Sequence, residues 1–215
     1  MTVPYSRRRL FGLYGITDEG PGLTRRVEQA LQGGVSMIQY RDKTRTKAQR
    51  EYQALELLGL CHRFGVPVII NDDLDLAISI GADGVHLGQN DPDPQTARQL
   101  LGPDSIIGVS CYNRFQLAAD AQRKDADYVA FGSFFPSGTK PGAVRADIAL
   151  LRRAAEELRI PAVAIGGITP ENGGALIRAG AAMLAVIQGL FGQSDIGAAC
   201  SRFNQLFASI KELQP

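Results

Sequence analysis

The sequence predicts an α/β protein, a single (β/α)8 TIM barrel that forms one domain over residues 1–215. Three observations predict this fold. Short apolar runs alternate strictly with longer amphipathic runs along the whole chain, eight of each. The short runs are apolar on both faces, as parallel strands covered by helices should be. The length of 215 residues lies within the range that such barrels commonly occupy.

The expected strands are the short apolar runs, each of which ends in a polar or glycine-containing segment. They cover residues 10–17, 35–40, 67–71, 84–87, 106–110, 128–133, 161–165 and 183–187. A doubly wound open sheet is the alternative, but it would show a glycine-rich fingerprint after its first strand. Here the first strand ends in Gly15-Ile16-Thr17-Asp18, which lacks that fingerprint.

The expected helices fill the intervals, because apolar residues recur there at helical spacing. They cover residues 23–31, 46–64, 74–80, 94–101, 114–124, 147–158, 170–179 and 196–213. Gly81 and Gly180 follow two of these helices, where glycine is the usual C-cap before the chain returns to a sheet. Thr169 followed by Pro170 is typical of a helix N-terminus.

Composition favours a protein that acts on small molecules in a reducing compartment. The formal charge of +1 shows no bias toward nucleic acid or membrane, and no segment has the ~20 apolar residues that span a bilayer. The three cysteines are widely spaced and odd in number, which argues against disulfides and favours the cytoplasm. The basic run at residues 7–9 is followed by too short an apolar segment for an export signal. A homo-oligomer is compatible with the sequence, which does not fix the oligomeric state.

The segment after the sixth strand has the residues of a phosphate-binding loop. Ser137, Gly138, Thr139 and Lys140 offer backbone N–H groups, two hydroxyls and one ammonium group. In a barrel, the loops after strands seven and eight often build a phosphate site. Those loops begin here at Gly166-Gly167 and at Ile187-Gln188. We therefore expect an anion site between these three strand ends.

The second strand ends with a second group of anion-binding side chains. Alternate residues of a strand point to the same side, so Gln39, Arg41 and Lys43 are expected to face the barrel mouth together. An amide and two cations suit a diphosphate. The alternative is a solvated basic turn, which is the interpretation we prefer for Arg45 and Lys47.

Asp72 and Asp91 follow neighbouring strands, so their carboxylates could converge on Mg²⁺. The alternative, equally weighted on the residues alone, is that these aspartates cap the helices that follow them.

Ser110 ends the fifth strand, but no His–carboxylate pair accompanies it, so a hydrolase triad is not indicated. His86 lies in mid-strand, where a hydrogen-bonded structural histidine is expected.

Taken together, the strand ends closely resemble those of the thiamine phosphate synthase (thiamine-phosphate pyrophosphorylase) family. The matching segments extend in the expected order over nearly the whole chain. They are residues 13–18, 39–43, 70–72, 81–89 with Asp91, 108–110, 137–140 and 164–169.

The resemblance implies a TIM-barrel catalytic domain that transfers an alkyl group. It implies that hydroxymethylpyrimidine diphosphate is joined to hydroxyethylthiazole phosphate, giving thiamine phosphate and diphosphate. The implied pyrimidine-diphosphate contacts are Gln39, Tyr40, Arg41, Asp42, Lys43, Asn71, Ser110 and Lys140. The implied thiazole-phosphate contacts are Ser137, Gly138, Thr139, Gly167, Ile187 and Gln188. The implied Mg²⁺ ligands are Asp72 and Asp91.

Two positions depart from the commonest family pattern. Ser137 stands where Thr is frequent and keeps a hydroxyl, whereas Gln188 stands where Ser is frequent and brings a larger amide. The resemblance also implies a dissociative mechanism, and the sequence offers no obvious nucleophile or general base. The expected catalytic groups, Arg41, Lys43, Ser110 and Lys140, would therefore stabilise a leaving diphosphate together with Mg²⁺.

Three alternatives remain at this point. A thiazole tautomerase would share the barrel but would need an acid/base residue and no metal pair. A Schiff-base aldolase would use Lys43 or Lys140 as its amine. A binding module without catalytic activity would hold both phosphorylated compounds and release them unchanged.

Overall fold

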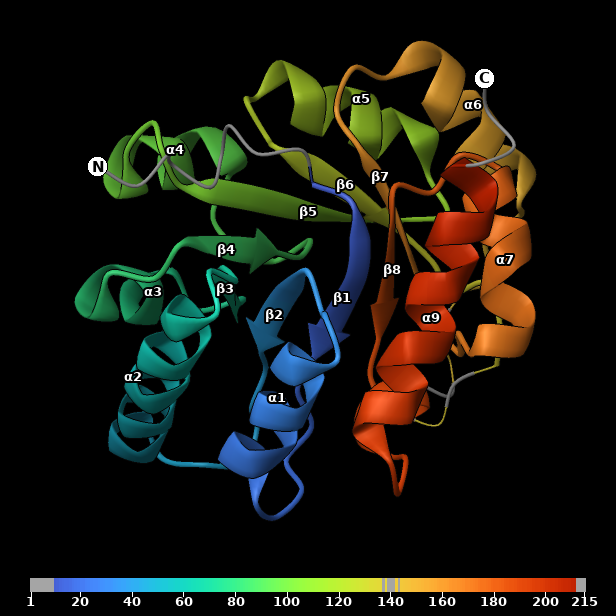
Figure 1. Cartoon of the computed structure of the whole chain (residues 1–215). Coiled ribbons are helices and arrows are strands. Elements are labelled where there is room, and N and C mark those ends of the chain that lie inside the picture. Colours follow the sequence, from blue (N-terminus) through green and yellow to red (C-terminus); the bar gives the residue numbers. More distant parts are fainter. Residues whose placement is uncertain (1–9, 137, 139–141, 143, 212–215) are drawn as a thin grey trace.

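The computed structural model describes residues 10–136, 138, 142 and 144–211. Eight parallel strands close into a barrel in sequence order, which confirms the predicted fold class (Figure 1). The strands are β1 (Gly12–Ile16), β2 (Met37–Tyr40), β3 (Val68–Asn71), β4 (Gly84–Leu87), β5 (Ile106–Tyr112), β6 (Tyr128–Phe131), β7 (Ala162–Ile165) and β8 (Met183–Val186). The arrowheads of β1 and β8 point to the lower side of Figure 1, which is therefore the C-terminal mouth of the barrel.

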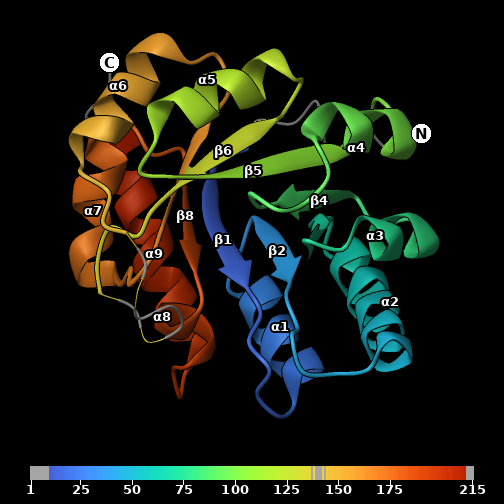
Figure 2. The ribbon, with the colours of Figure 1, turned by 180° about the vertical axis from the view of Figure 1, so that it is seen from behind.

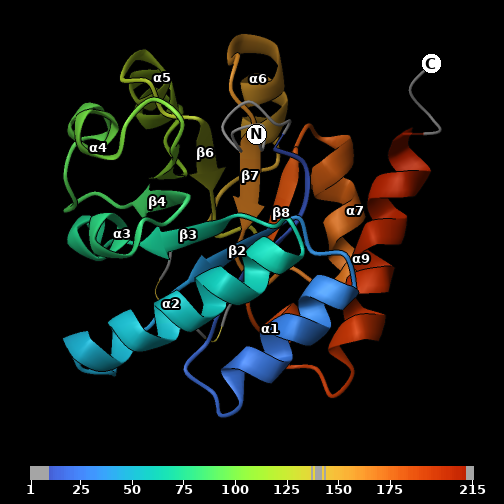
Figure 3. The ribbon, with the colours of Figure 1, turned by 60° about the vertical axis from the view of Figure 1, so that its left-hand side comes forward.

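The helices lie outside the strands and cover the barrel on all sides in Figures 2 and 3. They are α1 (Leu23–Gln32), α2 (Lys47–Arg63), α3 (Leu74–Ile80), α4 (Pro94–Leu101), α5 (Phe115–Arg123), α6 (Ala149–Glu157), α7 (Pro170–Arg178), α8 (Gln188–Phe191) and α9 (Ile196–Lys211). The four-residue helix α8 is a difference from the prediction. In the part of the chain that the structure describes, no helix combines the length and the apolar character needed to cross a membrane.

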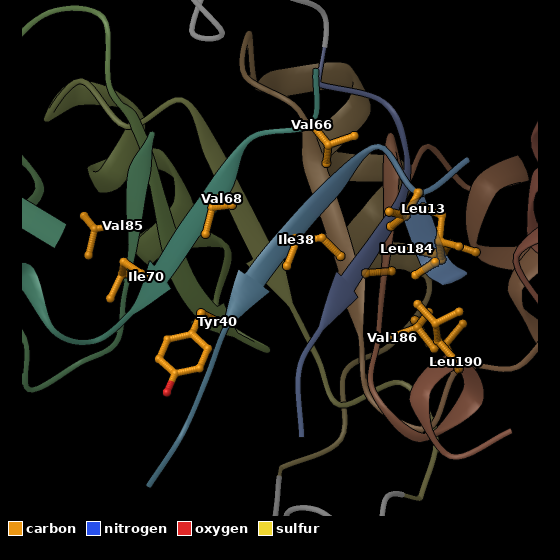
Figure 4. Close-up of a cluster of buried hydrophobic side chains, with 14 of the residues drawn as sticks. Leu13, Ile38, Tyr40, Val66, Val68, Ile70, Val85, Leu184, Val186 and Leu190 are labelled. Atoms are coloured by element: carbon orange, nitrogen blue, oxygen red, sulfur yellow. The ribbon is translucent and has the colours of Figure 1, made fainter. Parts of the chain in front are cut away.

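The strands carry two apolar layers, because alternate side chains point to opposite sides. The outer layer packs against the helices, and Figure 4 shows part of it, with Ile38 and Tyr40 of β2 beside Val68 and Ile70 of β3. The inner layer fills the barrel and contains the buried side chains of Tyr14, Met37, Ile69, Ile106, Tyr128, Val163 and Met183. Burial on both faces explains why the strand sequences show no polar alternation.

The end of β6 differs from the prediction in a way that shapes the mouth. The strand ends at Phe131 rather than at residue 133. Backbone N–H groups of Phe134 and Phe135 donate instead to the carbonyl oxygens of Ile165 (3.1 Å) and Gly166 (3.0 Å). The chain therefore leaves β6 and runs along the end of β7, which carries the following loop toward Gly167.

Candidate active site at the barrel mouth

The end of β2 is fastened to the segment after β1. The backbone N–H of Arg41 donates to Thr17 Oγ1 (2.9 Å), and the Thr17 hydroxyl donates to the carbonyl oxygen of Arg41 (3.2 Å). Glu19 Oε1 accepts the backbone N–H of Lys43 (3.2 Å) and lies 3.5 Å from Arg41 Nη1. The side chain of Arg41 is 18% exposed, so its cation is held partly out of water at the rim.

Two predicted contacts on this segment, Tyr40 and Asp42, do not join the group at the mouth. Tyr40 lies in the outer layer (Figure 4), where its hydroxyl donates to Gln53 of α2 (3.2 Å). The Asp42 carboxylate is buried and accepts the backbone N–H groups of Thr44 (2.9 Å) and Arg45 (2.8 Å). The reason is the two-residue period of the strand, which turns Tyr40 and Asp42 away from the side that carries Gln39 and Arg41. In the structure these two side chains hold the β2–α2 connection together, and their contact with the pyrimidine diphosphate stays a prediction.

The ends of β3 and β4 bring Asp72, Asp91 and Lys43 together. Lys43 Nζ lies 2.5 Å from Asp72 Oδ2, and a side-chain hydrogen bond joins Asp72 to Asp91. Asp91 Oδ2 also accepts the backbone N–H of Gly88 (2.6 Å). The predicted convergence of the two carboxylates is therefore seen in the structure, and the helix-capping alternative is not. Asp73 and Asp93 provide the caps of α3 and α4 instead.

Backbone geometry fixes Asp72 in this position. Its φ of 61° lies in the left-handed region, which non-glycine residues seldom occupy and which Asp tolerates better than most. Its N–H donates to the carbonyl oxygen of His86 on β4 (2.9 Å). The carboxylate is thus turned toward the end of β4, and a strained backbone of this kind often accompanies a functional side chain.

The electrostatics of the two carboxylates differ. Burial alone would raise the pKa of Asp72, but the hydrogen bond and positive charge of Lys43 outweigh it, so this pKa is lowered. Burial, supported by the negative charge of Asp72, raises the pKa of Asp91 against the opposing effect of the Gly88 N–H. Two carboxylates this close disfavour each other's charge, and a cation between them would relieve that repulsion.

The residues present fit a magnesium ion. Within the described ranges, no group of three or more His, Cys, Asp or Glu side chains could hold a metal. Mg²⁺ commonly binds through one or two carboxylates and completes its shell with water and substrate phosphates. Asp72 and Asp91 provide that donor set at the rim, where a phosphorylated ligand could supply further oxygens.

Asn71 and Ser110 lie at the same end of the barrel. Asn71 pairs in register with His86 of β4, and its side chain hydrogen-bonds to Asp72. Ser110 is half-buried, and its Oγ lies 2.9 Å from His86 Nε2. With Gln39, Arg41 and Lys43, they place five predicted side chains around the ends of β2 to β5, together with the pair of aspartates.

The ends of β7 and β8 lie beside the loop that follows β6. Gly167 has a φ of 61°, and a Cβ atom there would fall 2.3 Å from the Pro136 carbonyl oxygen. Glycine is therefore required both by the backbone conformation and by the close approach. Gly138 is exposed, while Ser137, Thr139 and Lys140 lie outside the described residues.

Ile187 and Gln188 connect β8 to α8. Ile187 packs against the inner apolar layer, and Gln188 is the first residue of the helix. The amide Oε1 of Gln188 is turned toward Gly192 at the far end of α8, where an added Cβ would meet it at 2.4 Å. The larger side chain at this position is thus folded along its own helix.

Sequence reasoning missed a buried polar network beneath the mouth. Tyr14 and Tyr128 project into the barrel, and their hydroxyl oxygens lie 2.8 Å apart. Gln39 Nε2 donates to the Tyr14 hydroxyl (2.7 Å), and His86 Nδ1 lies 2.9 Å from the Tyr128 hydroxyl. The expectation that His86 is hydrogen-bonded is confirmed, but its contact with Ser110 connects it to the site. A tyrosine rather than a phenylalanine in an otherwise apolar strand was the available signal.

Comparison with known proteins agrees with this geometry. The family model described as thiamine monophosphate synthase matches residues 13–190. The thiamine-phosphate synthase of Thiobacillus denitrificans is 54% identical over 204 residues, covering 94% of this chain and 97% of the relative. The enzyme of the same name from Nitrosococcus oceani is 51% identical over 92% of this chain and 93% of its own length.

Among solved structures, thiamine phosphate pyrophosphorylase from Pyrococcus furiosus superposes with a TM-score of 0.84 at 30% identity, covering 96% of this chain and 98% of that one. A 3-hexulose-6-phosphate synthase superposes with a TM-score of 0.66 at 19% identity, which shows a shared fold alone. From its sequence, its closed barrel and these relatives, the chain belongs to the thiamine-phosphate synthase family and is an alkyl-group transferase.

Proposed function

We propose that this protein joins 4-amino-5-hydroxymethyl-2-methylpyrimidine diphosphate to hydroxyethylthiazole phosphate in the cytoplasm, releasing diphosphate and thiamine phosphate. The chain acts as one catalytic domain, and the substitution is dissociative and assisted by Mg²⁺. The observation that carries the proposal is the convergence of Arg41, Lys43, Asp72 and Asp91 at one side of the barrel mouth. Family membership supplies the identity of the two substrates.

Arg41 and Lys43 bind the diphosphate of the pyrimidine substrate and stabilise it as it leaves. Arg41 offers a planar fork of donors, and Lys43 offers a mobile point charge. Lys140, outside the described residues, adds a third cation by resemblance. Removing one well-placed donor to a developing negative charge typically costs about 10²–10³ in kcat. A bound Mg²⁺ would supply Lewis-acid neutralisation of the departing diphosphate.

Asn71 and Ser110 hold polar atoms of the same substrate, and Gln39 contacts it from the inner face of β2. On the other side of the mouth, Gly167, Ile187, Gln188 and the loop from Ser137 to Thr139 hold the phosphate of the thiazole. This fixes the thiazole nitrogen near the reacting carbon, so capture of the pyrimidine cation becomes an intramolecular event. The described residues provide no group that must act as a covalent nucleophile.

The Lys43–Asp72 pair disfavours the aldolase alternative. A Schiff-base lysine must bring its amine to a carbonyl carbon, whereas Lys43 Nζ is held 2.5 Å from the Asp72 carboxylate. Borohydride treatment with a carbonyl substrate should therefore trap no adduct on Lys43.

The direct test is to incubate the purified protein with both precursors and to measure thiamine phosphate with and without Mg²⁺. We expect Mg²⁺-dependent product from the wild type and at least a ~100-fold lower rate from Asp72→Asn. Asp75→Asn is the matched control, because Asp75 is exposed in the first turn of α3 and should leave the rate unchanged. Binding of both compounds without product would favour the binding-module alternative, and isomerisation of a thiazole without Mg²⁺ would favour the tautomerase.

A further inference from the structure

A continuous chain of four hydrogen bonds crosses the interior of the barrel and joins two residues of the mouth. It runs from Gln39 on β2 to Tyr14 on β1, then to Tyr128 on β6, to His86 on β4 and to Ser110 on β5. The four heavy-atom distances are 2.7, 2.8, 2.9 and 2.9 Å. Ser110 is half-buried at the C-terminal end of β5, whereas Gln39 is 2% exposed and is buried like the three middle residues.

The middle of the chain is closed off from water. Tyr14 is 1% exposed, Tyr128 is 0% exposed and His86 is 7% exposed. The Tyr14 and Tyr128 rings meet edge to face at 5.9 Å, and the His86 ring stacks on Tyr128 at 5.6 Å. Burial raises the pKa of both tyrosines, so both keep their hydroxyl protons. Each proton must then be used inside the network, because an unsatisfied buried donor is costly.

The heavy-atom distances allow two directions, because either hydroxyl can donate in the Tyr14–Tyr128 contact and the roles of the His86 nitrogens depend on the tautomer. The donation from Gln39 Nε2 to Tyr14 selects one of them for a neutral His86. The Gln39 amide donates to Tyr14, so the remaining role of the Tyr14 proton in this chain is to donate to Tyr128. Tyr128 in turn donates to His86 Nδ1, which must therefore be the bare nitrogen of the ring. The proton of a neutral imidazole then lies on Nε2 and is donated to Ser110 Oγ. The Ser110 hydroxyl proton is left to point toward the mouth.

We propose that Tyr14, Tyr128 and His86 are positioning residues that make Ser110 a hydrogen-bond donor, and Gln39 Oε1 an acceptor, toward the bound pyrimidine diphosphate. The proposal rests on the function proposed above for the ligand. Ser110 would donate to an oxygen of the leaving diphosphate, and the Gln39 carbonyl would accept from a donor on the pyrimidine. The specificity of the pocket is thus set by residues that never touch the substrate.

The tautomer of His86 gives a test that requires no substrate. The chain contains two histidines, and the second, His62, is exposed on α2, so His62→Gln assigns the spectrum. In ¹⁵N-labelled wild-type protein, we expect His86 to be protonated at Nε2 and bare at Nδ1. Tyr128→Phe should move His86 toward the Nδ1-protonated tautomer, whereas Tyr14→Phe should leave it unchanged because Tyr128 can still donate. A wild-type His86 protonated at Nδ1 would overturn the proposed direction.

Kinetics then test whether the tautomer matters to the reaction. Tyr128→Phe should lower kcat by about 100-fold while KM changes by less than ~3-fold, since a misdirected donor is missed most in the transition state. In a Ser110→Ala background the same Tyr128→Phe change should cost less than ~3-fold, because its effect passes through Ser110. If the loss of kcat in the double variant equalled the product of the losses in the two single variants, the proposal would be refuted.

Val129→Ala is the matched control for loosened packing, because Val129 neighbours Tyr128 on β6 but is buried in the outer layer. It should lower the unfolding temperature and leave kcat near the wild-type value. A wild type that makes no thiamine phosphate would defeat the proposed function, while the tautomer measurement would still decide the network on its own.

Discussion

Gly108→Ala should disturb both the stability and the chemistry of the barrel. Gly108 on β5 pairs in register with Tyr128 on β6, and an added Cβ would lie 2.0 Å from Tyr128 Cζ and 2.3 Å from its hydroxyl oxygen. Ordinary contacts begin near 3.4 Å, so the ring must move by about 1.4 Å. Overpacking of this kind costs about 1–3 kcal/mol, which lowers the unfolding temperature by roughly 2–12 °C in a chain of this size.

The same movement would lengthen the Tyr128 contacts with Tyr14 and His86 beyond hydrogen-bonding range, so kcat at 25 °C should also fall. Thermal unfolding and steady-state kinetics on the purified variant measure the two effects. Gly59→Ala is the control, because Gly59 is exposed within α2 and an added Cβ there meets nothing within 4 Å. It should stabilise the protein by about 0.5–1 kcal/mol. A Gly108→Ala protein as stable and active as the wild type would show that Tyr128 does not pack against β5.

Three further predictions concern the metal ion, the buried Asp42 carboxylate and the ion pair of Arg41. Chelation with EDTA should abolish turnover and leave the circular dichroism spectrum unchanged, with activity restored by Mg²⁺ and not by K⁺. Asp42→Asn should lower the unfolding free energy at neutral pH by about 1–3 kcal/mol, because two backbone N–H groups lose a charged acceptor. Burial opposes ionisation of Asp42, but these hydrogen bonds and Arg45 outweigh it, so the pKa of Asp42 is lowered in the folded state. The stabilisation is therefore fully present at pH values above the unfolded-state pKa of ~3.9, and it is lost as the pH falls through the lower pKa of the folded state. Urea titrations from pH 7 to pH 2 should therefore show the wild type converging on the variant. Glu19→Gln should strengthen inhibition by diphosphate about 3-fold, because it frees Arg41 from a partly exposed ion pair. Glu28→Gln on α1 is the control and should leave the inhibition constant unchanged. Unchanged inhibition in Glu19→Gln would place Arg41 outside the diphosphate site.

The sequence predicted the barrel because alternation of strand and helix is a local signal repeated along the whole chain. It also predicted the convergence of Lys43, Asp72 and Asp91, because the C-terminal ends of consecutive parallel strands must meet at one rim. The resemblance placed Tyr40 and Asp42 among the ligand contacts because it covers a contiguous segment, whereas side chains alternate along a strand. The period of two predicts that these two side chains point away from Gln39 and Arg41, as the structure has them.

The buried network could not be predicted in the same way. In a parallel barrel both faces of a strand are apolar, so the sequence does not show whether Tyr14 and Tyr128 point inward or outward. That depends on register, and the pairing of Gly108 with Tyr128 is a contact between strands that no local pattern reveals. Helix α8 was missed because four residues are too few to display a helical period.

If the proposed function holds, charge pairing at the mouth explains how a site rich in cations stays compact before a diphosphate binds. Arg41 lies beside Glu19 and Lys43 lies beside Asp72, so each described cation of the β2 end already has a carboxylate neighbour. In the proposed reaction, the phosphate groups of the ligand would become the new ion-pair partners of Arg41 and Lys43. The divalent cation that binds with these phosphates would become the new partner of Asp72. Binding then exchanges ion pairs and leaves no charge unpaired at a partly buried rim, where an unpaired charge would be costly. In the proposed reaction, the affinity for diphosphate would equal the difference in free energy between the ion pairs that form and the ion pairs that break. That difference is smaller than the full strength of the new pairs, so the diphosphate product could leave.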